Sequence, residues 1–203
     1  MGTDLIRKAF DQWTRGLDPI QSRVALFERV RDIPYAYPTS RDPVEVLSLR
    51  RGSCSGKHYL LGEMYRHSGL ATRHMICSHR FNESLIVFPD AMQEMLRKNE
   101  IVDLHDYLQI EVEGTWIDVD ATWEAGLRAF GFPVNEDWDG TSPMALSVVP
   151  EEFTLVERDP ERHKEEMLSK LTPRQRSLRG QFLQALNDWV QELTAELQRE
   201  GDT

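Results

Sequence analysis

The sequence is poor in cysteine: its 203 residues include only Cys54 and Cys77. Two cysteines cannot build the dense disulfide framework of a small secreted domain. The sequence also has no run of 18 apolar residues, so we expect no transmembrane helix and no membrane partner. The first ten residues contain no apolar h-region of a secretory signal. Together these features predict a cytoplasmic protein whose thiols stay reduced.

Basic residues are also scarce, since 24 lysines and arginines face 34 aspartates and glutamates, for a net charge of −10. A protein with this charge repels phosphate backbones, so we expect no nucleic-acid partner. The apolar share of 40% and the charged share of 29% are typical of a globular chain. The length predicts one main folded unit without internal repeats.

Apolar periodicity and turn residues predict an α+β fold. Helices are expected over residues 3–15, from 19 to about 30 with a break at Pro34, and over 43–49, 54–68 and 90–98. Strand-like pieces are expected over 74–79 and 84–88. Residues 106–112 and 115–120 alternate on either side of Glu113-Gly114, which predicts a β-hairpin with a two-residue turn. Residues 125–150 read mostly as loop. A long amphipathic helix is expected at about 173–199, either packed on the core or used for homodimerisation.

Cys54 is the candidate nucleophile because it follows a glycine at the predicted start of a helix. A helix N-terminus stabilises a thiolate through its free N–H groups, and the same groups can bind an oxyanion. Lys57 and His58 would lower the thiol pKa further if they faced Cys54. Cys77 lies in an apolar stretch, and we interpret it as a structural residue.

The predicted hairpin supplies a base and a group to orient it, as a thiolate nucleophile requires. If Val112 pairs with Thr115, then His105 and Asp120 are diagonal neighbours on one face of the sheet. Asp118 shares this face but is one step farther away. A bulge of one residue would break the parity.

Other assignments of these residues stay open. His58 is a competing base, four residues after Cys54 on the same helix. A further alternative is that Cys54, His105 and Asp120 are three unconnected residues of an ordinary α+β domain. A metal site built from His74, Cys77 and His79, or from Cys54 and His58, lacks a standard zinc spacing. We therefore expect neither a metal nor a cofactor.

Three segments resemble the transglutaminase-like family, over roughly residues 22–123. Residues 51–57 and 66–73 are similar to its Gly-x-Cys segment and the Arg-x-x-Gly-Leu-x-x-Arg ending of its cysteine helix. Residues 105–107 resemble its His-x-Trp segment, with tyrosine in place of tryptophan. Residues 116–122 resemble its Trp-x-x-Val-Asp-Pro-Thr segment, with alanine in place of proline.

The resemblance implies a papain-like core in which a cysteine helix packs on an antiparallel sheet. It also implies that Cys54 is the nucleophile, His105 the general base and acid, and Asp120 the residue that orients His105. We expect a catalytic core with N-terminal helices over 1–150 and a helical extension over 151–203.

The expected reaction is attack on an amide or isopeptide bond of a peptide, protein or small amide, through a thioester. Water or an amine acceptor would then release the acyl group. The alternative is a non-catalytic scaffold that binds a protein partner. The pattern does not identify a second oxyanion donor, for which Tyr35 and Tyr37 are candidates.

Overall fold

The computed structural model describes the backbone of residues 2–201 and the side chains of residues 4–199. The predicted α+β fold is confirmed. In chain order the elements are α1 (Gly2–Trp13), α2 (Pro19–Arg31), α3 (Pro43–Leu49), α4 (Cys54–His67), β1 (Thr72–Arg80), η1 (Phe81–Glu83), α5 (Asp90–Lys98), β2 (Val102–Val112), β3 (Thr115–Val119), η2 (Ala125–Phe130), β4 (Phe153–Val156), α6 (Pro160–Ser169) and α7 (Pro173–Gly201).

A four-stranded antiparallel sheet with the order β3-β2-β1-β4 forms the centre of the fold. The hairpin predicted from the alternation is confirmed, because Val112 pairs with Thr115 and Leu108 with Val119. Glu113 and Gly114 both have positive φ angles, 51° and 80°, as the tight turns that match the twist of a hairpin require. The two-residue turn therefore fixes the register of every side chain along β2 and β3.

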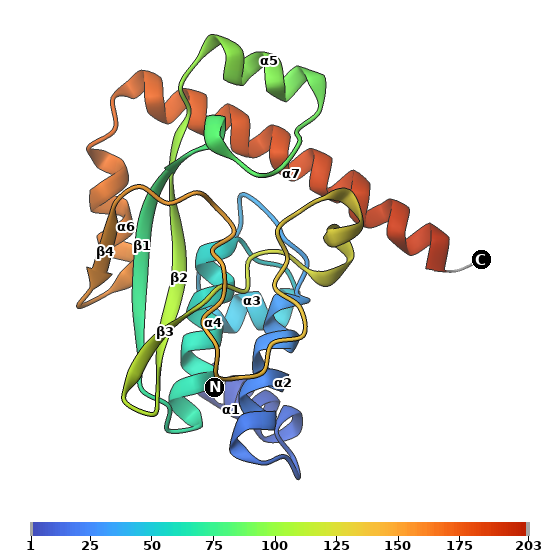
Figure 1. Ribbon diagram of the computed structural model, residues 1–203, viewed down its shortest axis with the longest axis vertical. Coiled ribbons are helices and arrows are strands. Elements are labelled where there is room, and N and C mark those ends of the chain that lie inside the picture. The colour runs from blue at the N-terminus through green and yellow to red at the C-terminus, as the bar shows by residue number, and fades with distance from the viewer. Residues whose placement is uncertain (1, 202–203) are drawn as a thin grey trace.

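The cysteine helix α4 lies against β2 and β1, and α1, α2 and α3 gather around it at one end of the molecule (Figure 1). Asp18 and Gln21 form a capping box at the start of α2. A Cβ atom on Gly56 would lie 2.8 Å from Val46 Cγ2 and 3.0 Å from the Ser40 carbonyl oxygen. A side chain at this position would push α3 and its preceding loop away from the first turn of α4.

The long helix α7 crosses the opposite end of the molecule, beside α5 (Figure 1). Its predicted apolar stripe includes Phe182, Leu186 and Leu193, which are buried in one core cluster with Trp123 and residues of the α5 region. The helix thus buries apolar surface within its own chain. Among the described residues, no helix is both long and apolar enough to span a membrane.

Two parts of the secondary structure were not predicted correctly. Residues 84–88 form no strand: Ile86 and Phe88 enter the core, but Leu85 and Val87 remain 63% and 80% exposed. The burial alternates as in a strand, but the segment stands in no ladder of the sheet. The sequence analysis also missed β4 and α6, because four residues of strand and ten of charged helix give little periodic signal.

Candidate active site

Cys54 is the first residue of α4, and its side chain is partly accessible. The preceding residue, Ser53, caps the helix by backbone conformation and makes no side-chain cap hydrogen bond. The first N–H groups of a helix have no acceptor within the helix. The Cys54 thiol therefore lies where free amide groups and the positive end of the helix dipole favour a negative charge.

His105 and Asp120 meet as the hairpin register predicts. His105 Nε2 lies 2.8 Å from Asp120 Oδ2 in a buried pair. Asp118 is engaged elsewhere, because its carboxylate accepts a hydrogen bond from Gln109. The two-residue turn determines this choice between the two aspartates, since it sets which of them lies diagonal to His105.

The Asp120 carboxylate is held on all sides. Oδ1 accepts hydrogen bonds from the backbone N–H and the hydroxyl of Thr122, at 3.0 and 2.6 Å. Oδ2 accepts one from the Ser147 N–H at 2.7 Å in addition to its contact with His105. Although burial favours the neutral acid, these donors and the His105 charge hold the pKa of Asp120 well below its usual range. Asp120 is therefore a fixed negative charge at neutral pH.

The thiol of Cys54 and the imidazole of His105 line the same small hollow, and each of the two groups shifts the pKa of the other. Burial alone would raise the pKa of Cys54, but the charge of Lys164 and the His105 imidazole outweigh it and lower this pKa. Burial acts against the His105 imidazolium, but Asp120 and Cys54 raise the pKa of His105 to about 10. Since Nε2 of His105 faces Asp120, Nδ1 is the ring nitrogen left for the thiol. These shifts favour a thiolate–imidazolium pair at neutral pH.

Both ring nitrogens of His58, the competing base, are hydrogen-bonded to backbone groups. Its Nδ1 lies 2.7 Å from the Cys54 carbonyl oxygen, and its Nε2 accepts a hydrogen bond from the Ala121 N–H at 2.9 Å. Burial lowers the pKa of His58 to about 4, so the ring is neutral. It ties the first turn of α4 to the segment after β3 and has no ring nitrogen left to move a proton.

The expectation that Lys57 and His58 lower the Cys54 pKa is wrong. Lys57 is fully buried and donates to the carbonyl oxygens of Arg31 and Thr122, at 2.6 and 2.8 Å. His58 carries no charge. The sequence distance to Cys54 was misleading because the polar atoms of both side chains are engaged by backbone groups instead of by the thiol.

Cys77 lies in the middle of β1, completely buried beside Met75 and Tyr107. Both cysteines are free thiols. Burial raises the pKa of Cys77 to about 12, so this thiol stays protonated. In the same strand His74 pairs with Leu108 and Cys77 with His105, and residues three apart in a strand point to opposite faces. Within the described residues, no group of three His, Cys, Asp or Glu side chains is arranged to hold a metal ion.

A buried polar cluster that was not predicted from the sequence lies beside Cys54. Lys164 of α6 hydrogen-bonds to the Ser55 hydroxyl at 2.9 Å and forms an ion pair with Asp106. Asp106 also accepts hydrogen bonds from Ser55 at 2.6 Å and from the Tyr59 hydroxyl at 3.2 Å. No local signal marks Lys164, because it lies more than 100 residues from Cys54 in a helix that the periodicity did not reveal.

Two hollows adjoin Cys54. The larger, of about 340 Å³, is polar and is bounded by the loop before α3, by Cys54 itself and by α6 and α7. The smaller, of about 40 Å³, is mainly apolar and lies between Cys54, His105, Trp123 and Val148. Tyr35, one candidate oxyanion donor, lines both hollows, and Tyr37 lines the larger. Residues 147 and 148, from the predicted loop, help to close the apolar side.

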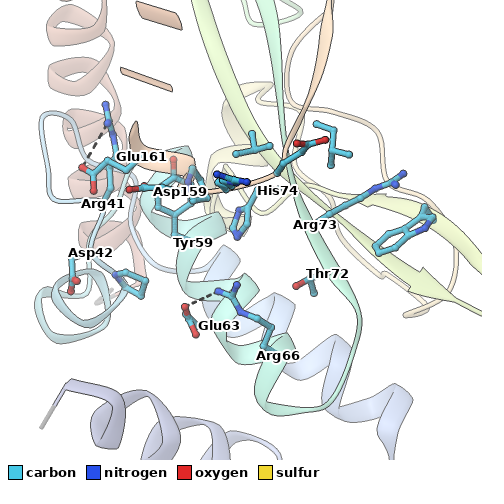
Figure 2. Close-up of a pocket in the computed structure, with 17 residues that line it drawn as sticks. Arg41, Asp42, Tyr59, Glu63, Arg66, Thr72, Arg73, His74, Asp159 and Glu161 are labelled. Atoms are coloured by element: carbon cyan, nitrogen blue, oxygen red, sulfur yellow. Dashed lines mark hydrogen bonds and ion pairs between the residues drawn. The ribbon is translucent and has the colours of Figure 1, made fainter. Parts of the chain in front are cut away.

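A third hollow, of about 760 Å³, lies along α4, β1 and the start of α6. Figure 2 shows Tyr59 and His74 on its wall and the contact of Arg41 with Glu161 at its edge. Cys54, His105 and Asp120 are not among the residues that line it. Arg41 and Glu161 also line the polar hollow beside Cys54, so the two hollows adjoin at this ion pair.

None of the curated proteins compared matches this chain. A protein from Cytophaga hutchinsonii, provisionally assigned as a cysteine protease, is 15% identical, with a TM-score of 0.44 over 62% of this chain and 39% of its own. A structure described as a TGase is 13% identical, with a TM-score of 0.42 over 60% of this chain and 31% of its own. The matched part is thus less than half of each solved chain.

The sequence pattern of the transglutaminase-like superfamily matches residues 9–121, which is more than half of the chain. The match begins in α1 and ends directly after Asp120, so that it contains Cys54 and His105 as well. It does not reach β4, α6 or α7. On this match, the chain is a member of the transglutaminase-like superfamily.

Proposed function

We propose that this protein is a cysteine enzyme that cleaves an amide or isopeptide bond through a thioester on Cys54. The observation that carries the proposal is that Cys54 and His105 line one small hollow while Nε2 of His105 lies 2.8 Å from Asp120 Oδ2. A nucleophile, a base and a residue that orients the base are the three parts that such catalysis requires.

In the first half of the reaction the Cys54 thiolate attacks the carbonyl carbon, and the carbonyl electrons move to oxygen. Free N–H groups at the start of α4 support this oxyanion. When the oxyanion collapses, the carbon–nitrogen bond breaks, and the His105 imidazolium gives its proton to the leaving amine. A thioester on Cys54 and a neutral His105 remain.

In the second half an acceptor attacks the thioester while His105 takes its proton. Water as the acceptor yields a carboxylic acid, and an amine yields a new amide. We favour water, because it is always available. The reaction needs Cys54 in its reduced form, which agrees with the cytoplasmic location expected from the sequence.

The first experiment measures the pH dependence of iodoacetamide alkylation at Cys54 and Cys77, resolved by peptide mass spectrometry. We expect Cys54 to react with an apparent pKa below the roughly 8.5 of a free thiol. His105→Ala should raise that pKa, because it removes the imidazole and its positive charge. Cys77 is the internal control and should stay unreactive until the protein unfolds.

If Cys54 titrates as a free thiol in both proteins, the thiolate–imidazole pair does not exist and the proposal fails. A non-catalytic scaffold that binds a protein partner would then replace it. If the pair exists, amide substrates incubated with and without an added amine distinguish the two acceptors. Hydrolysis gives the acid in both cases, whereas transfer adds the mass of the amine to the product.

A further inference from the structure

Lys164 is buried in a way that the fold alone does not require. Its side chain is 3% exposed, and its ammonium group contacts Ser55 and Asp106. Burying a lysine and an aspartate removes both from water, and the resulting pair often adds no net stability over apolar side chains of similar size. Helix α6 has other anchors, because Met167 and Leu168 pack on Ile76 and the residues around it.

The ammonium group of Lys164 lies beside the sulfur atom of Cys54. The Ser55 hydroxyl stands between them, 2.9 Å from Lys164 Nζ and 4.0 Å from Cys54 Sγ. Both side chains also line the same polar hollow. The two contacts place the Lys164 ammonium group within about 7 Å of the Cys54 sulfur. At this distance in a protein interior, a fixed positive charge still strongly stabilises a thiolate.

We propose that Lys164 is a positioning residue of the Cys54 site, whose buried ammonium group stabilises the thiolate through a fixed positive charge. This inference rests on the proposed function, because it assigns a second source of the thiolate beside His105. It also gives α6 a role in catalysis, although α6 lies outside the segment that matches the family.

Other charged and titratable groups also affect the pKa of Cys54. The sign of each charge decides whether removing the group raises or lowers this pKa. Asp106 opposes Lys164, since a negative charge disfavours the thiolate, and it ranks below Lys164 and His105 in its effect on the Cys54 pKa. Further groups that act on Cys54 or on its partners in this cluster include Arg179, Asp103, Tyr35, Tyr37, Tyr59, Arg41, His79, Cys77 and Asp120.

The test uses two variants that break the same ion pair from opposite ends. Lys164→Met should raise the apparent pKa of Cys54 by about one unit. Asp106→Asn should lower it, by a smaller amount. If the pair only held the structure together, both variants would disturb Cys54 in the same direction. Alkylation of Cys54 across pH measures both shifts without a substrate.

Three further variants complete the experiment. Lys164→Arg keeps the charge and should keep the Cys54 pKa near that of the wild type. Lys170→Met removes an exposed lysine from the end of the same helix and should change nothing. Lys164→Met combined with Asp106→Asn leaves no unpaired buried charge, so it serves if Lys164→Met alone does not fold. Its Cys54 pKa should still lie above that of the wild type.

Shifts of the same sign in Lys164→Met and Asp106→Asn would overturn the inference, and so would an unchanged Cys54 pKa in folded Lys164→Met. Failure of the proposed function looks different, because His105→Ala would then also leave the Cys54 pKa unchanged. A shift with His105→Ala but none with Lys164→Met would retain the proposed function and remove only the role of Lys164.

Discussion

The surroundings of Cys54 and Cys77 show how the same side chain acquires opposite chemistry within one core. Cys77 stands directly across the β1–β2 ladder from His105, yet its pKa rises to about 12 because burial among apolar groups disfavours the thiolate. Cys54 is distant from His105 in sequence and on a different element, yet its pKa falls. A neighbouring histidine is therefore not enough to activate a thiol.

Cys54 differs from Cys77 in what surrounds the sulfur. It has the free N–H groups of a helix start, the His105 imidazole and the buried charge of Lys164. Cys77 has Met75, Tyr107 and the apolar residues Leu146 and Val148. A reactive thiol therefore needs several groups, supplied by separate helices and strands, that together stabilise the negative charge on its sulfur atom.

The largest difference should appear when each cysteine is replaced by alanine. Cys54→Ala should abolish amide cleavage because it removes the nucleophile, whereas Cys77→Ala should keep most of the activity. The measurement is turnover of an amide substrate found in the screen, with circular dichroism to verify folding. Activity retained in Cys54→Ala would contradict the whole assignment, since no thioester could then form.

Replacing Asp120 should have a smaller effect on the same site. Asp120→Asn should reduce turnover by about 10²–10⁴-fold, because the imidazole loses the group that orients it. It should also move the alkaline limit of the activity to lower pH. In the wild type this limit is expected near pH 10, where His105 loses its proton, and the Asp120 charge is a main cause of that high value.

A pH–rate profile of both proteins checks this prediction. Asp118→Asn is the matched control, because Asp118 lies on the same hairpin and bonds to Gln109 instead of His105. Its profile should coincide with that of the wild type. An alkaline limit that stays in place in Asp120→Asn would mean that another group sets the protonation of His105.

The smallest effect concerns stability, where the order of the two cysteines should reverse. Cys77→Ala removes a fully buried sulfur atom and should cost about 1 kcal/mol of unfolding free energy. Cys54→Ala changes a partly accessible side chain and should stay within about 0.5 kcal/mol of the wild type. Urea unfolding measures both values. A larger loss of unfolding free energy in Cys54→Ala than in Cys77→Ala would show that the Cys54 side chain also stabilises the fold.

The parts of this protein that could be predicted from sequence depend on local rules. The Glu113-Gly114 turn fixes the hairpin register, and the register fixes the pairing of His105 with Asp120. The Asp18 capping box and the apolar stripe of α7 follow from patterns that repeat within a few residues. Each of these features could be predicted because a short stretch of chain contains its whole cause.

Only the tertiary structure decided which groups control the charge on Cys54. His58 and Lys57 are its neighbours in sequence, but their side chains serve backbone carbonyl and amide groups. Lys164, which does act on the thiol, comes from a helix that no periodicity revealed. The reason is physical: an electrostatic effect depends on distance and burial in space, and the sequence order specifies neither for residues that are brought together only by packing.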